Sequence, residues 1–331
     1  MINSYIRGIA HYVPEEILTN EDLSKLMDTS DEWIRTRTGI HKRHTVGDTN
    51  LGPADLAVKA SNILFEKLKL NKDEIDFVVF ATSTPDYFVP GSGSIFQDKL
   101  GLNNIGVLDI RQGCSGFTYA LTVADNFIKS GSYKNILVVG SEVQTTQLDF
   151  DDQGRGTAVL FGDGAAVCLV SATNEDKGIL SSHLHADGKY IEELGTEFPS
   201  SRYKDIITSE NVKERKHHIH MNGREVFKHA VRRFPEVILE GLEYNNLKIE
   251  DVDLVVPHQA NFRITQAVQK KLNIPENKVF SNIHKYGNTT AASIGIALSE
   301  ALNEKLIKSG DIIVLASFGA GWYWGSVIIK W

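Results

Sequence analysis

The chain has 331 residues, of which 42% are hydrophobic and 23% are charged, a composition that is ordinary for a soluble globular protein. This composition excludes disordered and fibrous proteins. The formal net charge of −7 argues against general nucleic-acid binding, which needs a positive field over the phosphates. No stretch reaches the roughly 18 uninterrupted apolar residues of a membrane span, and the first residues lack a secretion signal, so we expect a cytoplasmic protein without membrane contact.

Short apolar runs alternate with helical patterns along the chain, which is typical of a layered α/β protein with buried strands. In chain order, we expect strands at residues 77–82, 136–140, 165–170, 254–257, 312–317 and 326–329. Two pairs of segments also resemble each other. Asp76 and Asp253, 177 positions apart, each precede an apolar strand, and the sequence IKSG ends at both Gly131 and Gly310. We therefore expect a duplicated α/β unit, with one half at residues 1–172 and the other at residues 173–331.

Cys114 and Asn288 each stand just before an amphipathic stretch, so both are expected at helix N-termini in like positions of the two halves. The positive end of a helix dipole favours a thiolate, which is the form of cysteine that acts as a nucleophile. The alternative is that Cys114 is a small packed residue and Asn288 a simple helix cap.

The expected strand at residues 254–257 is followed by three polar side chains, those of His258, Gln259 and Asn261. Ligands of open α/β sheets usually bind at the ends of strands. A lone histidine is more often structural, but its coincidence with Cys114 and Asn288 favours a catalytic set.

Eight motifs follow one another along nearly the whole chain: TSDEWIRTRTGIHKR, QGCSGFTYAL, RGTAVLFGDGAA, HLHADG, MNGREVFKHAV, PHQANFRI, YGNTTAAS and SFGAGWYWGS. Together they resemble the β-ketoacyl-acyl-carrier-protein synthase III family, whose members start fatty-acid synthesis. The resemblance implies a thiolase-like five-layered αβαβα fold and a homodimer. It also implies a decarboxylative Claisen condensation of a short acyl-CoA with malonyl-carrier protein, which yields a 3-oxoacyl-carrier protein, CoA and CO2 without a further cofactor.

The resemblance implies a role for each candidate catalytic residue. Cys114 would carry the acyl group, while His258 and Asn288 would bind the thioester oxygen on which negative charge develops as CO2 leaves. The backbone N–H groups of Cys114 and Ala320 would form the oxyanion hole. Gly319 and Gly321 would permit the close backbone approach that this hole requires.

For coenzyme A, the resemblance implies that Trp33 and Arg155 hold the adenine ring and that Arg37 lies near the phosphates. Asn261 would reach the pantetheine amide, and Gly223 would let the pantetheine arm pass. On the residues alone, Trp33 is equally well explained as a core side chain.

The carrier protein of this family is acidic, so we expect it to bind a basic face. A helix beginning near residue 223 places three basic residues along one side, and three more follow His258. The six expected carrier contacts are Arg224, Lys228, Arg232, Arg263, Lys270 and Lys271. Such charge stripes are more often plain solvated faces.

The candidate acyl-pocket residues are Phe88, Val89 and Trp322. Val89 stands before a proline where relatives often carry phenylalanine, which would enlarge the pocket, whereas Trp322 adds bulk near the oxyanion turn. The primer therefore stays open between acetyl and a short branched acyl group.

Other functions fit the residues less well. A specialised acyltransferase or condensing enzyme of secondary metabolism would use the same cysteine, whereas a silent binding subunit would be expected to lose it. A hydrolase would need an acidic residue to orient His258, and none is evident.

The His217, His218 and His220 run lacks a partner at metal-binding spacing, so no metal is expected. Cys168 lies in an apolar run and is expected to be buried and inert.

Overall fold

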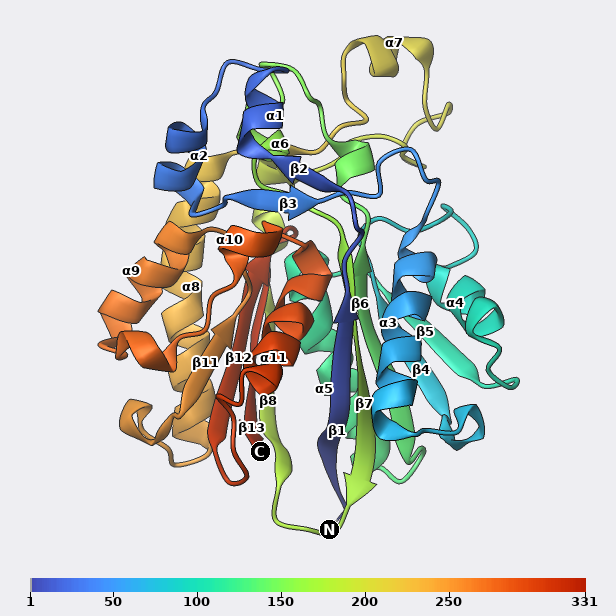
Figure 1. The fold of residues 1–331 in the computed structure, drawn as a ribbon, viewed down its shortest axis with the longest axis vertical. Helices are drawn as coiled ribbons and strands as arrows, with labels where there is room; N and C mark the ends of the chain where they lie inside the picture. The colour runs from blue at the N-terminus through green and yellow to red at the C-terminus, as the bar shows by residue number, and fades with distance from the viewer. Residues whose placement is uncertain (1) are drawn as a thin grey trace.

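A computed structural model describes residues 2–331 and contains two large β-sheets that lie side by side (Figure 1). The first sheet has the strand order β1-β7-β6-β4-β5. Its strands are β1 (Asn3–Tyr12), β4 (Phe77–Ala81), β5 (Gly106–Ile110), β6 (Asn135–Glu142) and β7 (Gly164–Thr173). The second sheet has the order β11-β12-β13-β8. Its strands are β8 (Gly178–Ala186), β11 (Leu254–Pro257), β12 (Ile312–Gly319) and β13 (Tyr323–Lys330).

The two sheets repeat one topology. In the first, β4 and β6 are parallel, and β6, β7 and β1 then pair antiparallel. In the second, β11 and β12 are parallel, and β12, β13 and β8 pair antiparallel. β5 is an additional strand at one edge of the first sheet. Each half thus repeats the same four-strand unit, as the paired sequence segments predict.

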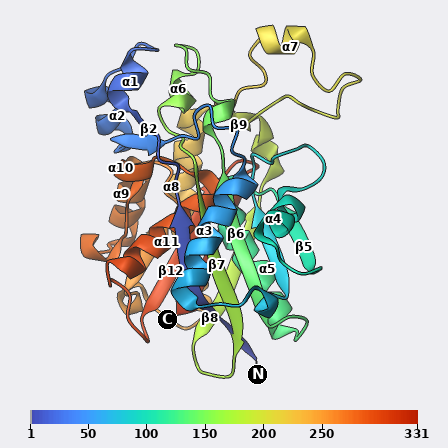
Figure 2. The ribbon, with the colours of Figure 1, turned by 45° about the vertical axis from the view of Figure 1, so that its right-hand side comes forward.

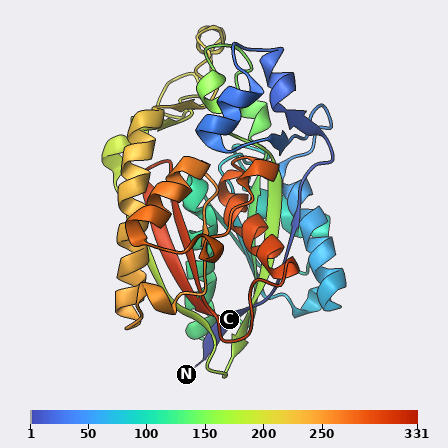
Figure 3. The same ribbon diagram turned by 60° about the vertical axis from the view of Figure 1, so that its left-hand side comes forward.

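Helices cover both sheets and fill the space between them. Helices α3 (Pro53–Leu68) and α4 (Ser92–Leu100) pack on the first sheet, and α8 (Gly223–Tyr244) packs on the second with α9 (Phe262–Leu272) beside it. Between the sheets lie α5 (Gly116–Lys129) and α11 (Ser293–Asn303) (Figure 3). The arrangement is the predicted five-layered αβαβα fold.

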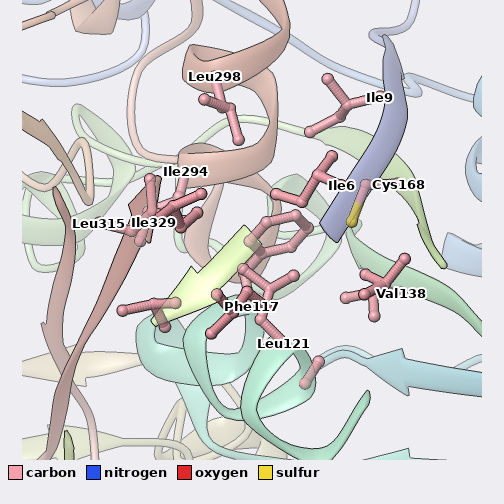
Figure 4. Packing of buried hydrophobic residues seen from close by; sticks show 14 of the residues in the cluster. Ile6, Ile9, Phe117, Leu121, Val138, Cys168, Ile294, Leu298, Leu315 and Ile329 are labelled. Carbon is pink, nitrogen blue, oxygen red and sulfur yellow. The ribbon is translucent and has the colours of Figure 1, made fainter. Parts of the chain in front are cut away.

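The central helix layer is apolar because it is enclosed by a sheet on each side. Phe117 and Leu121 of α5 and Ile294 and Leu298 of α11 are fully buried (Figure 4). Burial of each such side chain contributes roughly 1.5–3 kcal/mol to folding. The rigid layer fixes the N-terminal ends of both helices relative to each other.

The remaining elements gather mainly at one end of the sheets (Figure 2). They are β2 (Ile17–Thr19), β3 (Lys42–His44), α1 (Asn20–Ser24), α2 (Asp31–Thr38), α6 (Arg155–Ala158) and α10 (Ile283–Tyr286), together with the excursion formed by β9 (Leu194–Gly195), α7 (Ser209–Lys213) and β10 (His220–Met221). Short 3-10 turns are η1 (Lys72–Glu74), η2 (Gly113–Ser115), η3 (Thr145–Gln147), η4 (Gly188–Glu193), η5 (Ile249–Asp251), η6 (Glu276–Lys278) and η7 (Thr290–Ala292). The helices of residues 2–331 include none with the length and apolarity needed to cross a membrane.

All six predicted strands are present, most of them one to three residues longer at an end. The sequence did not predict the other three strands of the two large sheets, β1, β5 and β8, or the short strands β2, β3, β9 and β10. β5 is an edge strand with mostly exposed residues, and β8 is rich in serine and histidine, so neither shows an apolar run. β1 mixes buried and half-buried positions, so it does not show a continuous apolar run either.

Candidate active site

Cys114 lies in the turn η2, directly before α5, and is 6% exposed. The second half contains the equivalent turn η7 directly before α11. Both turns begin 36 residues after the first residue of the matching strands β4 and β11. The counterpart of Cys114 is therefore Ala291, and the prediction that Asn288 occupies the like position is wrong by three residues. Asn288 precedes the turn instead.

The prediction that the helix N-terminus favours a Cys114 thiolate is also wrong. Burial, with the nearby Glu142 carboxyl as a second cause, raises the pKa of Cys114 to about 12. The backbone N–H groups of Cys114 and Ala320 act in the opposite direction but do not outweigh burial. Cys114 is therefore a thiol at neutral pH, and its proton must leave as the acyl group is transferred.

His258 follows β11 and is 2% exposed. Burial lowers its pKa to about 3, so the imidazole is neutral. Its Nδ1 is hydrogen-bonded to the Ser293 hydroxyl, which also accepts from the backbone N–H of Gln259. In residues 2–331, only Nδ1 of His258 is placed to accept the proton of the Ser293 hydroxyl. Nδ1 therefore carries no proton itself, and the proton of the neutral imidazole lies on Nε2. Nε2 is buried and has no partner among the described residues, so it is a free donor.

Asn288 is oriented by its own turn. Its Oδ1 accepts a hydrogen bond of 2.8 Å from the backbone N–H of Thr290. Because the oxygen is held in this way, the Nδ2 group is left to donate elsewhere. The backbone of Asn288 is fixed through hydrogen bonds to Leu160 and Gly162.

Cys114, His258 and Asn288 meet at one cavity of about 110 Å3, although they come from three separate parts of the chain. Gly223 and Asn261 also line it. Among the described residues, the nearest atom to a Cβ at Gly223 would be the Cε of Met221 at 3.7 Å, so packing does not require glycine there. Asn261 caps α9 through its Oδ1 and donates to the backbone oxygen of Arg37 at 3.1 Å, so part of its hydrogen-bonding capacity is already used.

The turn after β12 brings Ala320 and its flanking glycines against the nucleophile. A Cβ at Gly319 would lie 2.5 Å from the Cys114 Cβ and 2.9 Å from its sulfur, so only glycine fits. Gly321 has a φ of 103°, a conformation that side chains rarely adopt. The two backbone N–H groups predicted to form the oxyanion hole, those of Cys114 and Ala320, both lower the pKa of the Cys114 thiol.

A second, larger cavity of about 510 Å3 also borders Cys114. Cys114, Phe161 and Leu194 line both cavities. The larger cavity is enclosed partly by the segment 194–199, which belongs to the irregular excursion. Cys114 thus lines both the small cavity, where the free donors lie, and the large one.

Only one of the three predicted acyl-pocket residues lines the large cavity. Phe88 does, whereas Val89 is 79% exposed in the single chain. Trp322 is 1% exposed and packs against Phe318 and Tyr190 in the core of the second half, and Tyr323 reaches the cavity instead. The assignment of Trp322 to the pocket wall is therefore wrong, because its side chain is buried in the core of the second half.

Trp33 lies half-buried on α2 and is flanked by two guanidinium groups. The Cζ of Arg37 is 5.0 Å from the ring centroid, and the Cζ of Arg155 is 5.3 Å from it. The three residues predicted to bind the nucleotide end of coenzyme A are thus together.

The six predicted carrier contacts are exposed on α8 and α9, which pack against each other. Lys228 and Arg232 each form an ion pair within α8, at 2.9 Å to Glu225 and Glu236. The other four, Arg224, Arg263, Lys270 and Lys271, have no carboxylate within ion-pairing distance in the described part of the chain. Arg263 lies over the Phe227 ring, which borders the small cavity.

Three residues of the site were missed by the sequence reading. Ser293 orients His258, and Glu142, fully buried with its pKa raised by burial to about 7, accepts hydrogen bonds from Ser83, Thr84 and the backbone of Ala291. Gln144 lines the large cavity. No local motif marks these residues, because their importance comes from neighbours 35 to 149 positions away.

Several other residues are structural. The Gln259 side chain, which follows His258, is saturated by Pro257, Ser281 and Asn282. Cys168 is fully buried in β7, as predicted, and both cysteines are free. Residues 2–331 contain no group of three or more histidine, cysteine or acidic side chains arranged to hold a metal ion.

A buried cysteine at the head of a central helix, with a neutral histidine and an asparagine as free donors, characterises a thiolase-fold condensing enzyme. Comparisons with known proteins agree. Residues 108–188 match the family model described as 3-oxoacyl-[acyl-carrier-protein] synthase III, and residues 242–331 match the model of its C-terminal part.

Curated relatives cover the whole chain. The β-ketoacyl-[acyl-carrier-protein] synthase III of Clostridioides difficile is 46% identical over 326 residues, which cover 98% of each chain. That of Listeria innocua is 44% identical over 330 residues, which cover 100% of this chain and 99% of the relative. The crystal structure of the synthase III of Aquifex aeolicus is 42% identical, superposes with a TM-score of 0.91 and covers 99% of this chain and 100% of its own. The chain belongs to the β-ketoacyl-[acyl-carrier-protein] synthase III family.

Proposed function

We propose that this synthase condenses a short acyl-CoA with malonyl-carrier protein, with Cys114, His258 and Asn288 as its catalytic residues. The observation that carries the proposal is the shared cavity, in which a nucleophilic sulfur faces two free hydrogen-bond donors of neutral side chains. Neutral donors suit an oxygen that gains negative charge only during the reaction. The proposed substrates suit a cytoplasmic enzyme.

In the first half-reaction, the Cys114 sulfur attacks the thioester carbonyl of acyl-CoA. The bond from carbon to Cys114 forms, the bond to the CoA sulfur breaks, and the thiol proton of Cys114 leaves with CoA as its thiol. The N–H groups of Cys114 and Ala320 stabilise the tetrahedral oxyanion. Trp33, Arg37 and Arg155 bind the nucleotide end, and the pantetheine arm passes Gly223 and Asn261 through the small cavity.

In the second half-reaction, the malonyl group on the carrier loses CO2, and the electron pair of the broken carbon–carbon bond forms an enolate. The Nε2–H of His258 and the Nδ2–H of Asn288 donate to its oxygen. The enolate carbon then attacks the acyl group on Cys114. The Cys114 thiolate is released and takes up one proton, which restores the starting enzyme.

The carrier protein docks on the basic face of α8 and α9. Four of these side chains have no carboxylate partner among the described residues, so they are available to an acidic protein: Arg224, Arg263, Lys270 and Lys271. Gly223 and Phe227 border the small cavity beside this face, which lets the carrier's pantetheine arm enter directly.

We also propose a homodimer that forms across β5. Within residues 2–331 this strand pairs on one side only, with β4, and its other edge is unpaired. The adjoining loop exposes Tyr87, Phe88 and Val89, of which Val89 is 79% exposed. An exposed edge next to an apolar loop is a ready surface for a second copy. Light scattering at micromolar protein is expected to give twice the chain mass, and a monomer would refute this pairing.

Each proposed residue role belongs to one half-reaction, so variants can be tested by measuring the two half-reactions separately. His258→Ala and Asn288→Ala are expected to retain acyl transfer from acetyl-CoA to Cys114 but to lose CO2 release from malonyl-carrier protein by about a hundredfold or more. Cys114→Ala should lose acyl transfer altogether. If His258→Ala and Asn288→Ala condense normally, the assignment of the donors is wrong. If the wild-type chain accepts acyl groups but never releases CO2 from malonyl-carrier protein, the function is that of a specialised acyltransferase and not of a condensing synthase.

A further inference from the structure

The segment that leads into Asn288 is too short to hold its own position. It contains α10, a helix of four residues, whereas isolated helices need about 12–15 residues to be even marginally stable in water. The helix ends at Gly287, whose φ of 65° is a conformation that glycine adopts far more readily than other residues. Contacts with the rest of the fold must therefore fix the path of the chain into Asn288.

The carboxylate of Glu300 on α11 binds this segment near both of its ends. Oε1 accepts a hydrogen bond of 2.7 Å from the Tyr286 hydroxyl, and Oε2 accepts one of 2.8 Å from Nδ2 of Asn282. The Lys285 ammonium also lies 3.2 Å from Oε1. Burial acts to raise the pKa of Glu300, but the hydrogen bonds from these three side chains outweigh it and lower the pKa. Glu300 is thus ionised at neutral pH, and its hydrogen bonds are of the strong, charge-assisted kind.

Tyr286 is held in place on its ring as well as on its hydroxyl. Its ring centroid lies 5.6 Å from that of His44 and 6.1 Å from that of His11. The ring also packs against Ala292 and Ile296 at the start of the central helix layer. Tyr286 is two residues before Asn288, so it is a stiff link between Glu300 and this donor.

The same network reaches His258. Oε1 of Gln259, the next residue, accepts a hydrogen bond of 3.1 Å from the backbone N–H of Asn282. Asn282 is therefore bound to the neighbour of His258 through its backbone and to Glu300 through its side chain. Ser293, which orients the His258 ring, lies on α11 about two helical turns before Glu300 and on the same face.

We infer that Glu300 is a positioning residue for the condensation step. It holds the segment 282–286 and thereby sets where Asn288 places its Nδ2 group relative to Nε2 of His258. The inference rests on the proposed function, in which these two groups donate to one enolate oxygen. Both donors must then lie about 2.7–3.1 Å from the same atom, so a small shift of either weakens the stabilisation. Acylation of Cys114 uses backbone N–H groups instead and does not depend on this segment.

The test is a double-mutant cycle on the release of CO2 from malonyl-carrier protein. Glu300→Ala alone is expected to lower kcat by about tenfold or more, because a donor displaced by a fraction of an ångström is poorly aligned. In the Asn288→Ala background the same substitution should lower kcat by less than about twofold, since the donor that Glu300 positions is already gone. Acylation of Cys114 by acetyl-CoA should stay within about twofold of wild type. An equal loss in both backgrounds, or in both half-reactions, would overturn the inference.

Glu304→Ala is the matched control. Glu304 follows α11 directly, and its side chain makes one ion pair in the described part of the chain, with Lys285 at 3.8 Å. Its side chain is 49% exposed, against 14% for Glu300. Glu304→Ala should leave the rate of CO2 release within about twofold of wild type. A loss as large as that of Glu300→Ala would show that negative charge near Lys285, and not the hold on the segment, matters.

Tyr286→Phe is the milder variant, because it removes one oxygen atom and keeps the ring. Loss of this hydrogen bond should lower kcat for CO2 release by about threefold or more without raising KM for malonyl-carrier protein. Normal release by Tyr286→Phe would contradict the link through Tyr286. If Glu300→Ala does not fold, Tyr286→Phe takes its place in the cycle, with the same expectation. Failure of the proposed function is distinct, since Asn288→Ala alone would then release CO2 at the wild-type rate.

Discussion

The Ser293 hydroxyl donates a hydrogen bond to Nδ1 of His258 and thereby fixes the imidazole proton on Nε2, where it faces the cavity beside Cys114. Ser293 is the first residue of α11, and His258 follows β11, so the contact joins the central helix layer to the second sheet. The tautomer that decarboxylation needs is therefore built into the fold.

Ser293→Ala should impair condensation but not acyl transfer. Without the hydroxyl, the proton of the neutral imidazole can move to Nδ1, which removes the donor from the enolate oxygen. We expect kcat for CO2 release to fall by about 10-fold to 100-fold. The rate of Cys114 acylation by acetyl-CoA should stay within about twofold of wild type, as measured by quenched-flow mass spectrometry. Ser293→Thr, which keeps the hydroxyl, should restore much of the rate, and equal loss in both half-reactions would indicate a structural defect instead.

Gly319→Ala should block acyl transfer. Its Cβ would lie 2.5 Å from the Cys114 Cβ, so the turn that holds the Ala320 amide must move. A displacement near 1 Å in a catalytic group costs about a hundredfold in rate, and we expect a loss of this order in the acylation rate. Gly188→Ala is the matched control, since a Cβ there meets no atom of the described residues within 4 Å. Normal acylation by Gly319→Ala would show that this turn does not form the oxyanion hole.

Glu142→Gln should change how stability depends on pH. Burial raises the pKa of Glu142 to about 7 in the folded chain, against an ordinary value of 4.5. The protonated carboxyl is thus favoured by folding, so its contribution is fully present below pH 4.5 and is lost as the pH rises through 7. This amounts to about 3 kcal/mol of unfolding free energy.

Urea denaturation at pH 5 and pH 8 measures the effect. The wild-type chain should lose more unfolding free energy than Glu142→Gln between these pH values. His258 contributes in the opposite sense, since its lowered pKa destabilises the fold as the pH falls below 6.5, but it is common to both proteins. Parallel pH profiles for the two proteins would contradict the raised pKa of Glu142.

Trp33→Ala should weaken binding of the nucleotide end of coenzyme A. The ring presents its face to Arg37 and Arg155, and loss of the stacked clamp should raise KM for acetyl-CoA by about 5-fold to 10-fold with little change in kcat. Acetyl-pantetheine, which lacks the nucleotide, provides the internal control. Its KM should not change, and an equal rise for both substrates would place the defect elsewhere.

Arg263→Glu should raise KM for malonyl-carrier protein by about tenfold, because the substitution puts like charge against an acidic partner. The increase should shrink at high salt. The acylation step with acetyl-CoA should not change. Lys67→Glu on α3, in the opposite outer layer, carries the same charge change and should have no effect on KM for the carrier. A salt-insensitive defect in Arg263→Glu would argue against electrostatic docking.

The buried strands could be predicted from the sequence, because they leave apolar runs. The five-layered fold and the catalytic set of Cys114, His258 and Asn288 could be predicted because the family motifs are local in the sequence. The edge strand β5 could not, since its residues are mostly exposed. The pKa of Cys114 was predicted in the wrong direction, because burial and the distant Glu142 outweigh the helix terminus. Trp322 was assigned to the pocket wall but is buried in the core of the second half, and Ser293 acts through a neighbour that no motif reveals.

The central claim is that Cys114 carries the acyl group that decarboxylated malonyl-carrier protein removes. Intact-protein mass spectrometry tests it most directly, with wild type and Cys114→Ala each incubated with acyl-CoA and then with malonyl-carrier protein. Wild type alone should gain the mass of one acyl group and lose it as a 3-oxoacyl-carrier product appears. An acyl mass on Cys114→Ala, or product formed without an acylated wild-type chain, would contradict the account.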